Sequence, residues 1–177
     1  MSATLRAATP SDIPALQELI AASVRGLSPG FYTPAQIDAA LTDVFGVDSQ
    51  LIADGTYYVI EGESGPAAAG GWSRRRTLYG GDQAKDAADP LLDPAADAAR
   101  IRAFFVHPGY ARRGLARQLY AACEDAARAA GFRRFELMAT LPGEPLYVAL
   151  GFVAVERVER RLANGVVVPF TRMAREI

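Results

Sequence analysis

The chain has 177 residues, of which 50% are apolar and 22% are charged. This length suits one domain of about 150 residues with an insertion, and the composition excludes an intrinsically disordered chain or a small disulfide-stabilised scaffold. The 19 Lys and Arg residues nearly balance the 20 Asp and Glu residues. The net charge of −1 therefore creates no overall field that would favour nucleic acid or an anionic membrane as a partner.

Cys123 is the only cysteine and His107 the only histidine, which excludes an intramolecular disulfide and argues against a Cys/His zinc site. The N-terminus lacks the apolar region of a signal peptide, and no stretch approaches the roughly 18 apolar residues of a membrane span. We therefore expect a cytoplasmic protein that uses no metal.

Apolar periodicity predicts a strand, two helices and a hairpin in the N-terminal half. Apolar residues recur at intervals of three and four from Ile13 to Val24, which marks one face of a helix. Thr33 followed by Pro34 is typical of a helix start. In chain order the predicted elements are a strand at 4–8, a helix over about 13–24, a helix from its cap Thr33 to Gly46, and antiparallel strands at 57–60 and 67–72.

An acidic insertion is predicted between this hairpin and the next strand. Residues 80–97 contain two glycines, two prolines, five aspartates and Lys85, the only lysine of the chain. This composition favours an exposed loop. The loop either attracts a cationic amine or is simply solvated.

The C-terminal half alternates strands and helices. A strongly apolar strand precedes a turn with two arginines and two glycines, and a long amphipathic helix follows. The predicted elements are a strand at 101–106, a helix over about 114–130 closed by Gly131, a strand at 135–139, a short helix at 145–150 closed by Gly151, and strands at 152–158 and 166–173 around the turn Asn164-Gly165. We expect a single α/β domain over 1–177.

The turn before the long helix is the most informative segment. The helix begins after Gly114 without a Ser, Thr or Asp cap, so its first N–H groups need another acceptor. A phosphate satisfies them, and Gly114 and Ala116 let it approach the backbone. The alternative is a tight turn with solvated arginines. A Walker loop is excluded because no Lys-Ser or Lys-Thr follows the glycine, and GxGxxG is absent.

Two separate strings carry a resemblance to a known family. Residues 111–116, Ala-Arg-Arg-Gly-Leu-Ala, resemble the acetyl-CoA loop of the GNAT (GCN5-related) N-acetyltransferases, in which Arg or Gln, two residues, Gly, one residue and Gly or Ala follow one another. Ala111 occupies the position of the Arg or Gln. Residues 146–152, Leu-Tyr-Val-Ala-Leu-Gly-Phe, are similar to the family's Tyr-x-x-Leu-Gly-Phe string near the C-terminus.

The resemblance implies the GNAT fold, a mixed and mostly antiparallel sheet of about six or seven strands with about four flanking helices. It implies that strand 101–106 splays from strand 135–139 to form the acetyl-CoA cleft. It also implies transfer of an acetyl group from acetyl-CoA to a primary amine of a small molecule or peptide, by direct attack in a ternary complex. Tyr147 matches the family's general acid. The implied cofactor-binding residues are Phe105, Val106, Arg112, Arg113, Gly114, Leu115, Ala116, Arg117 and Thr140.

The acceptor pocket is less well defined. The resemblance places it near the first two helices, where Phe31, Tyr32 and Trp72 are candidate walls. Residues 74–76, three consecutive arginines, offer a cation for an acceptor carboxylate or form a solvated strand end.

The residues leave alternatives for the general base, for the class of function and for the oligomeric state. His107, Glu136 or a water relay are the alternatives for the general base. A regulatory module that binds acyl-CoA without turnover is the alternative function, and Tyr147 argues against it. Nucleic-acid binding through the arginines of 112–117 is disfavoured by the compact cluster and near-zero net charge. The final strands or the insertion also permit a homodimer.

Overall fold

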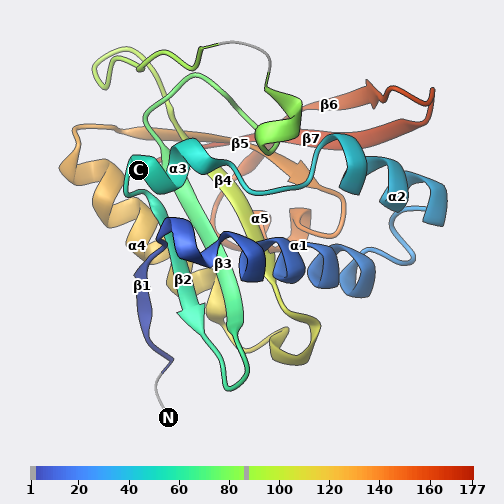
Figure 1. The fold of residues 1–177 in the computed structure, drawn as a ribbon. Coiled ribbons are helices and arrows are strands. Elements are labelled where there is room, and N and C mark those ends of the chain that lie inside the picture. The colour runs from blue at the N-terminus through green and yellow to red at the C-terminus, as the bar shows by residue number, and fades with distance from the viewer. Residues whose placement is uncertain (1–2, 86–87) are drawn as a thin grey trace.

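The computed structural model describes residues 3–85 and 88–177. Its seven strands form one sheet in the order β1-β2-β3-β4-β5-β7-β6, in which only the β4–β5 neighbours are parallel (Figure 1). The predicted mixed, mostly antiparallel sheet is confirmed. The strands are β1 Leu5–Ala7, β2 Tyr57–Glu61, β3 Pro66–Ser73, β4 Ala99–Val106, β5 Arg134–Thr140, β6 Val153–Arg161 and β7 Val167–Glu176. The helices are α1 Ile13–Leu27, α2 Pro34–Asp43, α3 Ser49–Ala53, α4 Leu115–Ala129 and α5 Glu144–Ala149, with short 3₁₀ turns at Pro10–Asp12, Asp82–Ala84 and Pro108–Tyr110.

Local sequence signals account for most element ends. The Thr33 hydroxyl accepts the N–H of Gln36 at 3.1 Å and caps α2 as predicted. The helix ends at Asp43, earlier than the predicted stop at Gly46, and the following Phe45 packs into the fold as part of a loop. The sequence analysis missed α3, because five residues are too few to show helical periodicity.

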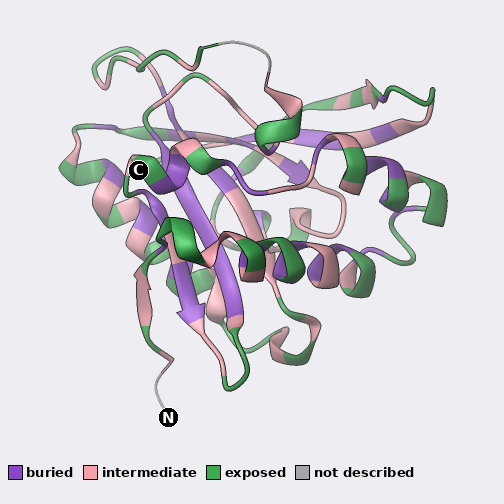
Figure 2. Cartoon of the chain, viewed as in Figure 1, coloured by how far each residue is buried: buried purple, intermediate pink, exposed green. Residues whose placement is uncertain are grey.

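Helices cover both faces of the sheet, and each face has its own core (Figures 1 and 2). On one face, Leu16 and Ile20 of α1 pack against Val59 of β2. On the other face, Cys123 of α4 packs with Phe135 of β5. All five side chains are almost fully buried, and full burial of such side chains contributes about 1.5–3 kcal/mol each. The two layers hold the sheet rigid between them.

The sheet opens between its two parallel strands. β4 and β5 are paired at only two positions, Ala99–Phe135 and Arg100–Glu136, although both strands continue beyond that point. The backbone groups that face this opening therefore have no neighbouring strand to pair with.

A bulge in β4 changes which side chains face each layer. The register between β3 and β4 shifts opposite Gly70, and Ala103 adopts a φ of +54°. A Cβ atom at Gly70 would lie 2.4 Å from the Phe104 ring, so only glycine leaves room for that ring. Because of the bulge, Arg102 and Ala103 both face the α1 layer, whereas regular alternation would place one on each face.

The acidic insertion is more firmly anchored than its composition predicts. Lys85 Nζ lies 2.6 Å from Asp48 Oδ2 and 3.4 Å from Asp89 Oδ2, and Arg102 Nη2 lies 2.9 Å from the same Asp48 oxygen. Much of the described insertion is exposed, as its composition predicts, but its lysine and one of its aspartates join a buried ion-pair network. Positions 86 and 87 of the predicted insertion lie outside the described residues.

Within the described part of the chain, no helix has both the length and the apolar content needed to cross a bilayer.

The buried tyrosines predict the response of the fold to alkaline pH. Burial raises the pKa of Tyr32 to about 12 and raises the pKa of Tyr57 and Tyr147 above the ordinary value. The contribution of these tyrosines to the free energy of unfolding should therefore stay level from neutral pH to about pH 10 and fall above it, because the unfolded phenols ionise while the folded ones stay protonated. Urea titrations over this pH range measure the free energy of unfolding. Tyr57→Phe removes one buried phenol and should make the fall of that free energy with pH less steep. A level unfolding free energy at alkaline pH would contradict the prediction.

Candidate functional site

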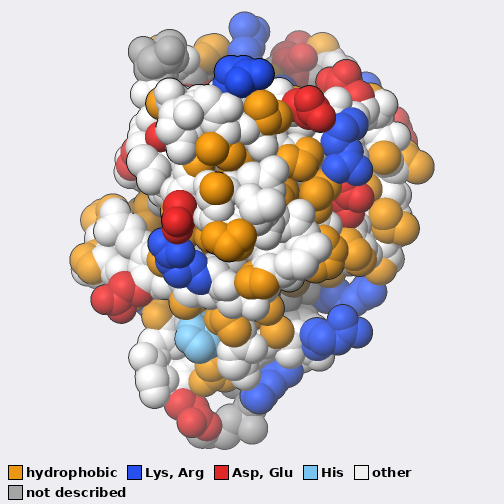
Figure 3. Space-filling view, turned by 90° about the vertical axis from the view of Figure 1, so that its right-hand side faces the viewer, with side chains coloured by type: hydrophobic (Ala, Val, Ile, Leu, Met, Phe, Trp, Pro, Cys, Tyr) orange, Lys and Arg blue, Asp and Glu red, His pale blue; other side chains and the backbone are white. Residues whose placement is uncertain are grey.

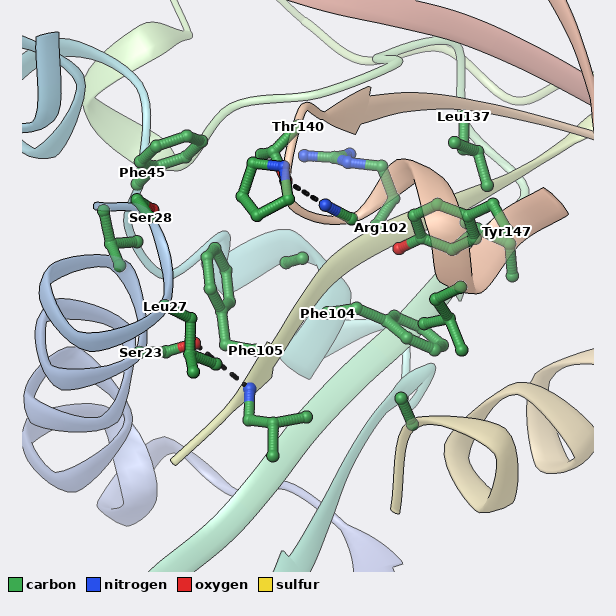
Figure 4. Close-up of a pocket in the computed structure, with 18 of the residues that line it drawn as sticks. Ser23, Leu27, Ser28, Phe45, Arg102, Phe104, Phe105, Leu137, Thr140 and Tyr147 are labelled. Carbon is green, nitrogen blue, oxygen red and sulfur yellow. Dashed lines mark hydrogen bonds between the residues drawn. The ribbon is translucent and has the colours of Figure 1, made fainter. Parts of the chain in front are cut away.

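One large cavity lies in the opening between β4 and β5. It has a volume of about 770 Å³ and reaches from the start of α4, through the gap in the sheet, to the loops beside α1 (Figure 4). Three arginines, Arg102, Arg112 and Arg117, are the only charged side chains among the described residues that line it. The cavity is therefore cationic, and the rest of its wall is mostly apolar.

The start of α4 forms one end of the cavity. Gly114 precedes the helix with a φ of +81°, and no side chain caps it. The first N–H with an acceptor inside the helix is that of Gln118, which donates to the Gly114 carbonyl at 3.1 Å. The preceding N–H groups, those of residues 115–117, point out of the helix, and a Cβ atom at Gly114 would meet nothing within 4 Å. Open space beside free amides is the geometry of a phosphate site.

Arginines surround this helix end. Arg112 and Arg117 line the cavity, whereas the guanidinium of Arg113 lies 5.3 Å from the centre of the Tyr110 ring and does not line it. In Figure 3, Lys and Arg side chains run along the lower right of the view, and others lie at the top, the upper right and the left. The positive end of the helix and two arginines thus act on the same space.

Backbone strain is concentrated in the cavity wall. Ala103 and Arg112 are the only non-glycine residues with positive φ in the described ranges, at +54° and +60°. Both line the cavity. Such conformations cost about 1–3 kcal/mol each and tend to occur at functional sites.

The end of β4 turns a backbone donor toward the gap. The N–H of His107 donates to the Ala67 carbonyl of β3 at 2.8 Å, so the N–H of Val106 points the other way. The Val106 N–H donates to the hydroxyl of Ser23 in α1 at 3.2 Å (Figure 4). Phe105 and Val106 both line the cavity, as do Gly114, Leu115, Ala116 and Thr140 from the predicted cofactor-binding set.

Thr140 has a local partner as well. Its hydroxyl accepts the N–H of Gly143 at 3.1 Å and so holds the turn between β5 and α5. Thr140 therefore helps to position α5 against the gap.

Tyr147 of α5 lines the middle of the cavity. Its ring lies 6.3 Å from the Phe104 ring and 5.7 Å from the Phe152 ring, centre to centre. Its hydroxyl makes no hydrogen bond to any protein atom of the described ranges. Burial raises the pKa of this phenol, so it stays protonated at neutral pH and its O–H can donate a hydrogen bond to a ligand.

The structure brings only one of the three predicted acceptor walls to the cavity. Phe31 lines it and is 50% exposed. Tyr32 is buried elsewhere: its hydroxyl donates to the Pro169 carbonyl at 2.7 Å and accepts the Leu141 N–H at 3.0 Å. Trp72 is buried in the core on the α4 side of the sheet. Both are structural, because the direction of each side chain takes it away from the gap.

Sequence analysis missed other wall residues. One feature of the sequence marks Arg102 as unusual: it is a charged residue inside an apolar strand. The remaining walls carry no chemical signal that separates them from core residues, and they include Phe45, Tyr79, Met138 and Phe170.

The candidate bases lie outside the cavity. The Nδ1 atom of His107 accepts the N–H of Gly109 at 3.0 Å and caps the 3₁₀ turn. Glu136 lies 3.1 Å from Arg100 and 3.5 Å from Arg172. Neither residue is among the described ones that line the cavity. Of the arginines at 74–76, Arg75 pairs with Asp54 at 2.7 Å, outside the cavity wall.

Comparison with known proteins supports one reading of this site. The family model of the acetyltransferase (GNAT) domain matches residues 93–177. A GCN5-related N-acetyltransferase from Rhodopseudomonas palustris has a similar structure, with a TM-score of 0.73 and 21% identity over 100% of this chain and 97% of its own. No curated protein sequence matches significantly.

Two further structures were solved with a ligand. PaiA N-acetyltransferase from Thermoplasma acidophilum, in complex with coenzyme A, has a TM-score of 0.65 and 12% identity over 100% of both chains. A phosphinothricin acetyltransferase from Sinorhizobium meliloti, in complex with AcCoA, has a TM-score of 0.62 and 21% identity over 100% of this chain and 89% of its own. These likenesses establish the fold.

Asp48 is expected to be the main stabilising partner of the buried Arg102. Asp48→Asn removes the negative charge but leaves the guanidinium buried, so the free energy of unfolding should fall by about 3–5 kcal/mol. The control is Asp38→Asn, because Asp38 makes an exposed pair with Arg25 and should cost less than about 1 kcal/mol. Denaturant unfolding measures both, and equal small losses would show that Asp48 does not offset the buried charge.

Proposed function

Because the acetyltransferase (GNAT) domain model matches residues 93–177 and the fold is that of solved GNAT structures, we propose that the chain is a GNAT acetyltransferase that transfers the acetyl group of acetyl-CoA to the amine of a small molecule or peptide. The transfer takes place by direct attack while both substrates are bound. The observation that carries this proposal is the single cavity, which joins the free amides of α4 to the Tyr147 hydroxyl through the gap in the sheet.

The residues at the start of α4 suit the phosphates of coenzyme A. The N–H groups of residues 115–117 would donate hydrogen bonds to the pyrophosphate, with Arg112 and Arg117 beside it. The Val106 N–H, on the open edge of β4, donates to the Ser23 hydroxyl in this structure and would exchange that acceptor for the pantetheine arm. Two relatives of similar fold that were solved with coenzyme A or AcCoA support this assignment. Acetyl-CoA supplies the activated acetyl thioester.

Tyr147 would act on the leaving group. The amine nitrogen forms a bond to the thioester carbonyl carbon, the carbon–sulfur bond breaks, and the sulfur takes the proton of the Tyr147 hydroxyl. Water returns a proton to the phenolate. The amine gives its proton to water, since the described residues that line the cavity include no carboxylate or imidazole.

Tyr147→Phe should lower the turnover number by about 10²–10⁴-fold, with little change in acetyl-CoA affinity, because only the proton donor is removed. Thiol release with a responsive amine and calorimetry with acetyl-CoA measure the two quantities. Tyr120→Phe is the control, since the Tyr120 hydroxyl accepts a hydrogen bond from Arg175 outside the cavity. Turnover equal to that of the unmodified protein would exclude the acid role.

Gly114→Glu should abolish acetyl-CoA binding, because it places bulk and negative charge beside the free amides. Gly165→Glu is a matched control: Gly165 has a φ of +84°, its Cβ atom would also meet nothing within 4 Å, and it lies in the turn between β6 and β7. The strain of a left-handed glutamate is thus the same in both variants.

Calorimetry on folded samples of Gly114→Glu and Gly165→Glu measures the affinity of each variant for acetyl-CoA. Unchanged affinity in Gly114→Glu would mean that the phosphates bind elsewhere. Tight acetyl-CoA binding with no acceptor-dependent thiol release from any amine would favour the alternative, an acyl-CoA-binding regulatory module.

A further inference from the structure

The part of the cavity that faces α1 and the loop before α3 has apolar, largely aromatic walls. We call it the acceptor side. Phe45 and Phe170 meet edge to face with ring centres 6.2 Å apart, and Tyr79 lies 5.6 Å from Phe170. Phe31 is half exposed at its rim. The walls of the acceptor side are Phe31, Phe45, Tyr79, Met138 and Phe170. Such walls suit an apolar group of a small ligand.

One cation lines this side. Arg112 and Arg117 belong to the start of α4, which leaves Arg102 as the remaining charged side chain among the described residues of the cavity wall. The bulge of β4 turns Arg102 toward this layer, and its side chain is only 1% exposed. Figure 4 draws it among the residues around the cavity.

The protein uses only part of the hydrogen-bonding capacity of Arg102. Nη2 donates to Asp48 at 2.9 Å and to the Gly80 carbonyl at 2.7 Å, and Nη1 donates to the Thr77 carbonyl at 3.3 Å. These three bonds leave two of the five N–H groups of the guanidinium, including Nε–H, without an acceptor in the described ranges. A buried donor of this kind favours a ligand acceptor.

The charge of Arg102 is also incompletely offset. Its Asp48 partner is shared with Lys85, whose Nζ atom lies 2.6 Å from the same carboxylate oxygen. One buried carboxylate thus faces two cations, and Asp89 balances the lysine only from 3.4 Å. A further negative charge on the cavity side of Arg102 would be stabilised.

We propose that Arg102 binds a carboxylate of the acceptor, so that the acceptor is a small amine with a carboxylate and an apolar group, such as an apolar amino acid. This inference rests on the proposed function and narrows it. A planar guanidinium matches a carboxylate, and the apolar walls hold the rest of the molecule. Polycationic amines are disfavoured, because the lining has three arginines and, among the described residues, no acid.

A carboxylate fits better than a phosphate monoester. Arg102 is the one cation of the acceptor side and is already partly neutralised by Asp48, so it offsets a single negative charge better than two. The Lys side chain of a peptide carries no carboxylate and would leave the two remaining N–H groups of Arg102 without an acceptor.

The unmodified protein provides the first test. Thiol release is measured with phenylalanine, methionine and leucine, each against its carboxamide and against phosphoethanolamine. We expect kcat/KM to be at least about tenfold higher for the free acids, as a charge-assisted hydrogen bond provides. The intrinsic reactivity of the amines works in the opposite direction, because an amino amide loses its ammonium proton more readily. Equal values, or a preference for the amides or the phosphate, would overturn the proposal.

Variants then test whether Arg102 is responsible. Arg102→Gln should raise KM for the free acid and remove the preference over the amide, and Arg102→Lys should restore part of it. Arg100→Gln is the matched control, because Arg100 lies on the same strand, pairs with Glu136 and does not line the cavity. A purely structural loss would lower kcat/KM equally for the free acid and for the amide and leave the ratio of the two values unchanged. That result would overturn the proposal. If Arg102→Gln does not fold, Arg102→Lys and the unmodified protein still decide it.

A binding measurement separates this inference from the proposed function. Calorimetry compares 3-phenylpropionate with 3-phenylpropanamide, neither of which can accept an acetyl group. We expect the acid to bind at least about tenfold more tightly and to lose this advantage in Arg102→Gln. If this result accompanies a lack of thiol release with every amine, the proposed function fails while the carboxylate site stands. Equal binding of the two compounds would overturn the site itself.

Discussion

The early separation of β4 and β5 is the constraint on which the rest of the structure depends. Parallel strands normally continue their hydrogen bonding along their length, and here pairing ends after two residue pairs. Local interactions shape both sides of the opening: β4 carries the bulge at Ala103, and the Thr140 hydroxyl holds the turn that leads from β5 into α5.

The second organising feature is the buried ion-pair network around Asp48. It joins three parts of the chain that are distant in the sequence: the cap of α3, the middle of β4, and the insertion, which contributes Lys85 and Asp89. A buried ion pair contributes little net stability. Removing one partner nevertheless destabilises the fold strongly, because the other charge is left buried and unpaired. The network therefore fixes where the insertion and Arg102 lie.

The sequence predicted the fold well because its signals were local. Thr33 caps α2, Gly114 starts α4, and the Tyr147 string forms the short helix beside the gap, each through contacts within a few residues. The acceptor side was less predictable. Tyr32 and Trp72 were chosen as walls by residue type, but the direction of a side chain depends on register and packing, which no short string encodes.

Arg102 and the insertion illustrate the same limit from the other direction. An arginine inside an apolar strand is unusual, yet its partner Asp48 lies 54 residues away in the sequence, so no spacing rule connects them. Likewise, aspartates and a lysine in a loop indicate exposure by composition, and only the tertiary structure shows that two of them are tied to that arginine.

The position of Lys85 has a chemical consequence for the protein itself. A thioester acylates accessible lysine amines without any enzyme, since an uncharged ε-amine is a competent nucleophile. The sole lysine of the chain has its Nζ atom between two carboxylates and its side chain is 17% exposed, while the remaining cations are arginines, which do not react in this way. Under the proposed function, the chain thus exposes almost no side-chain amine to self-acetylation.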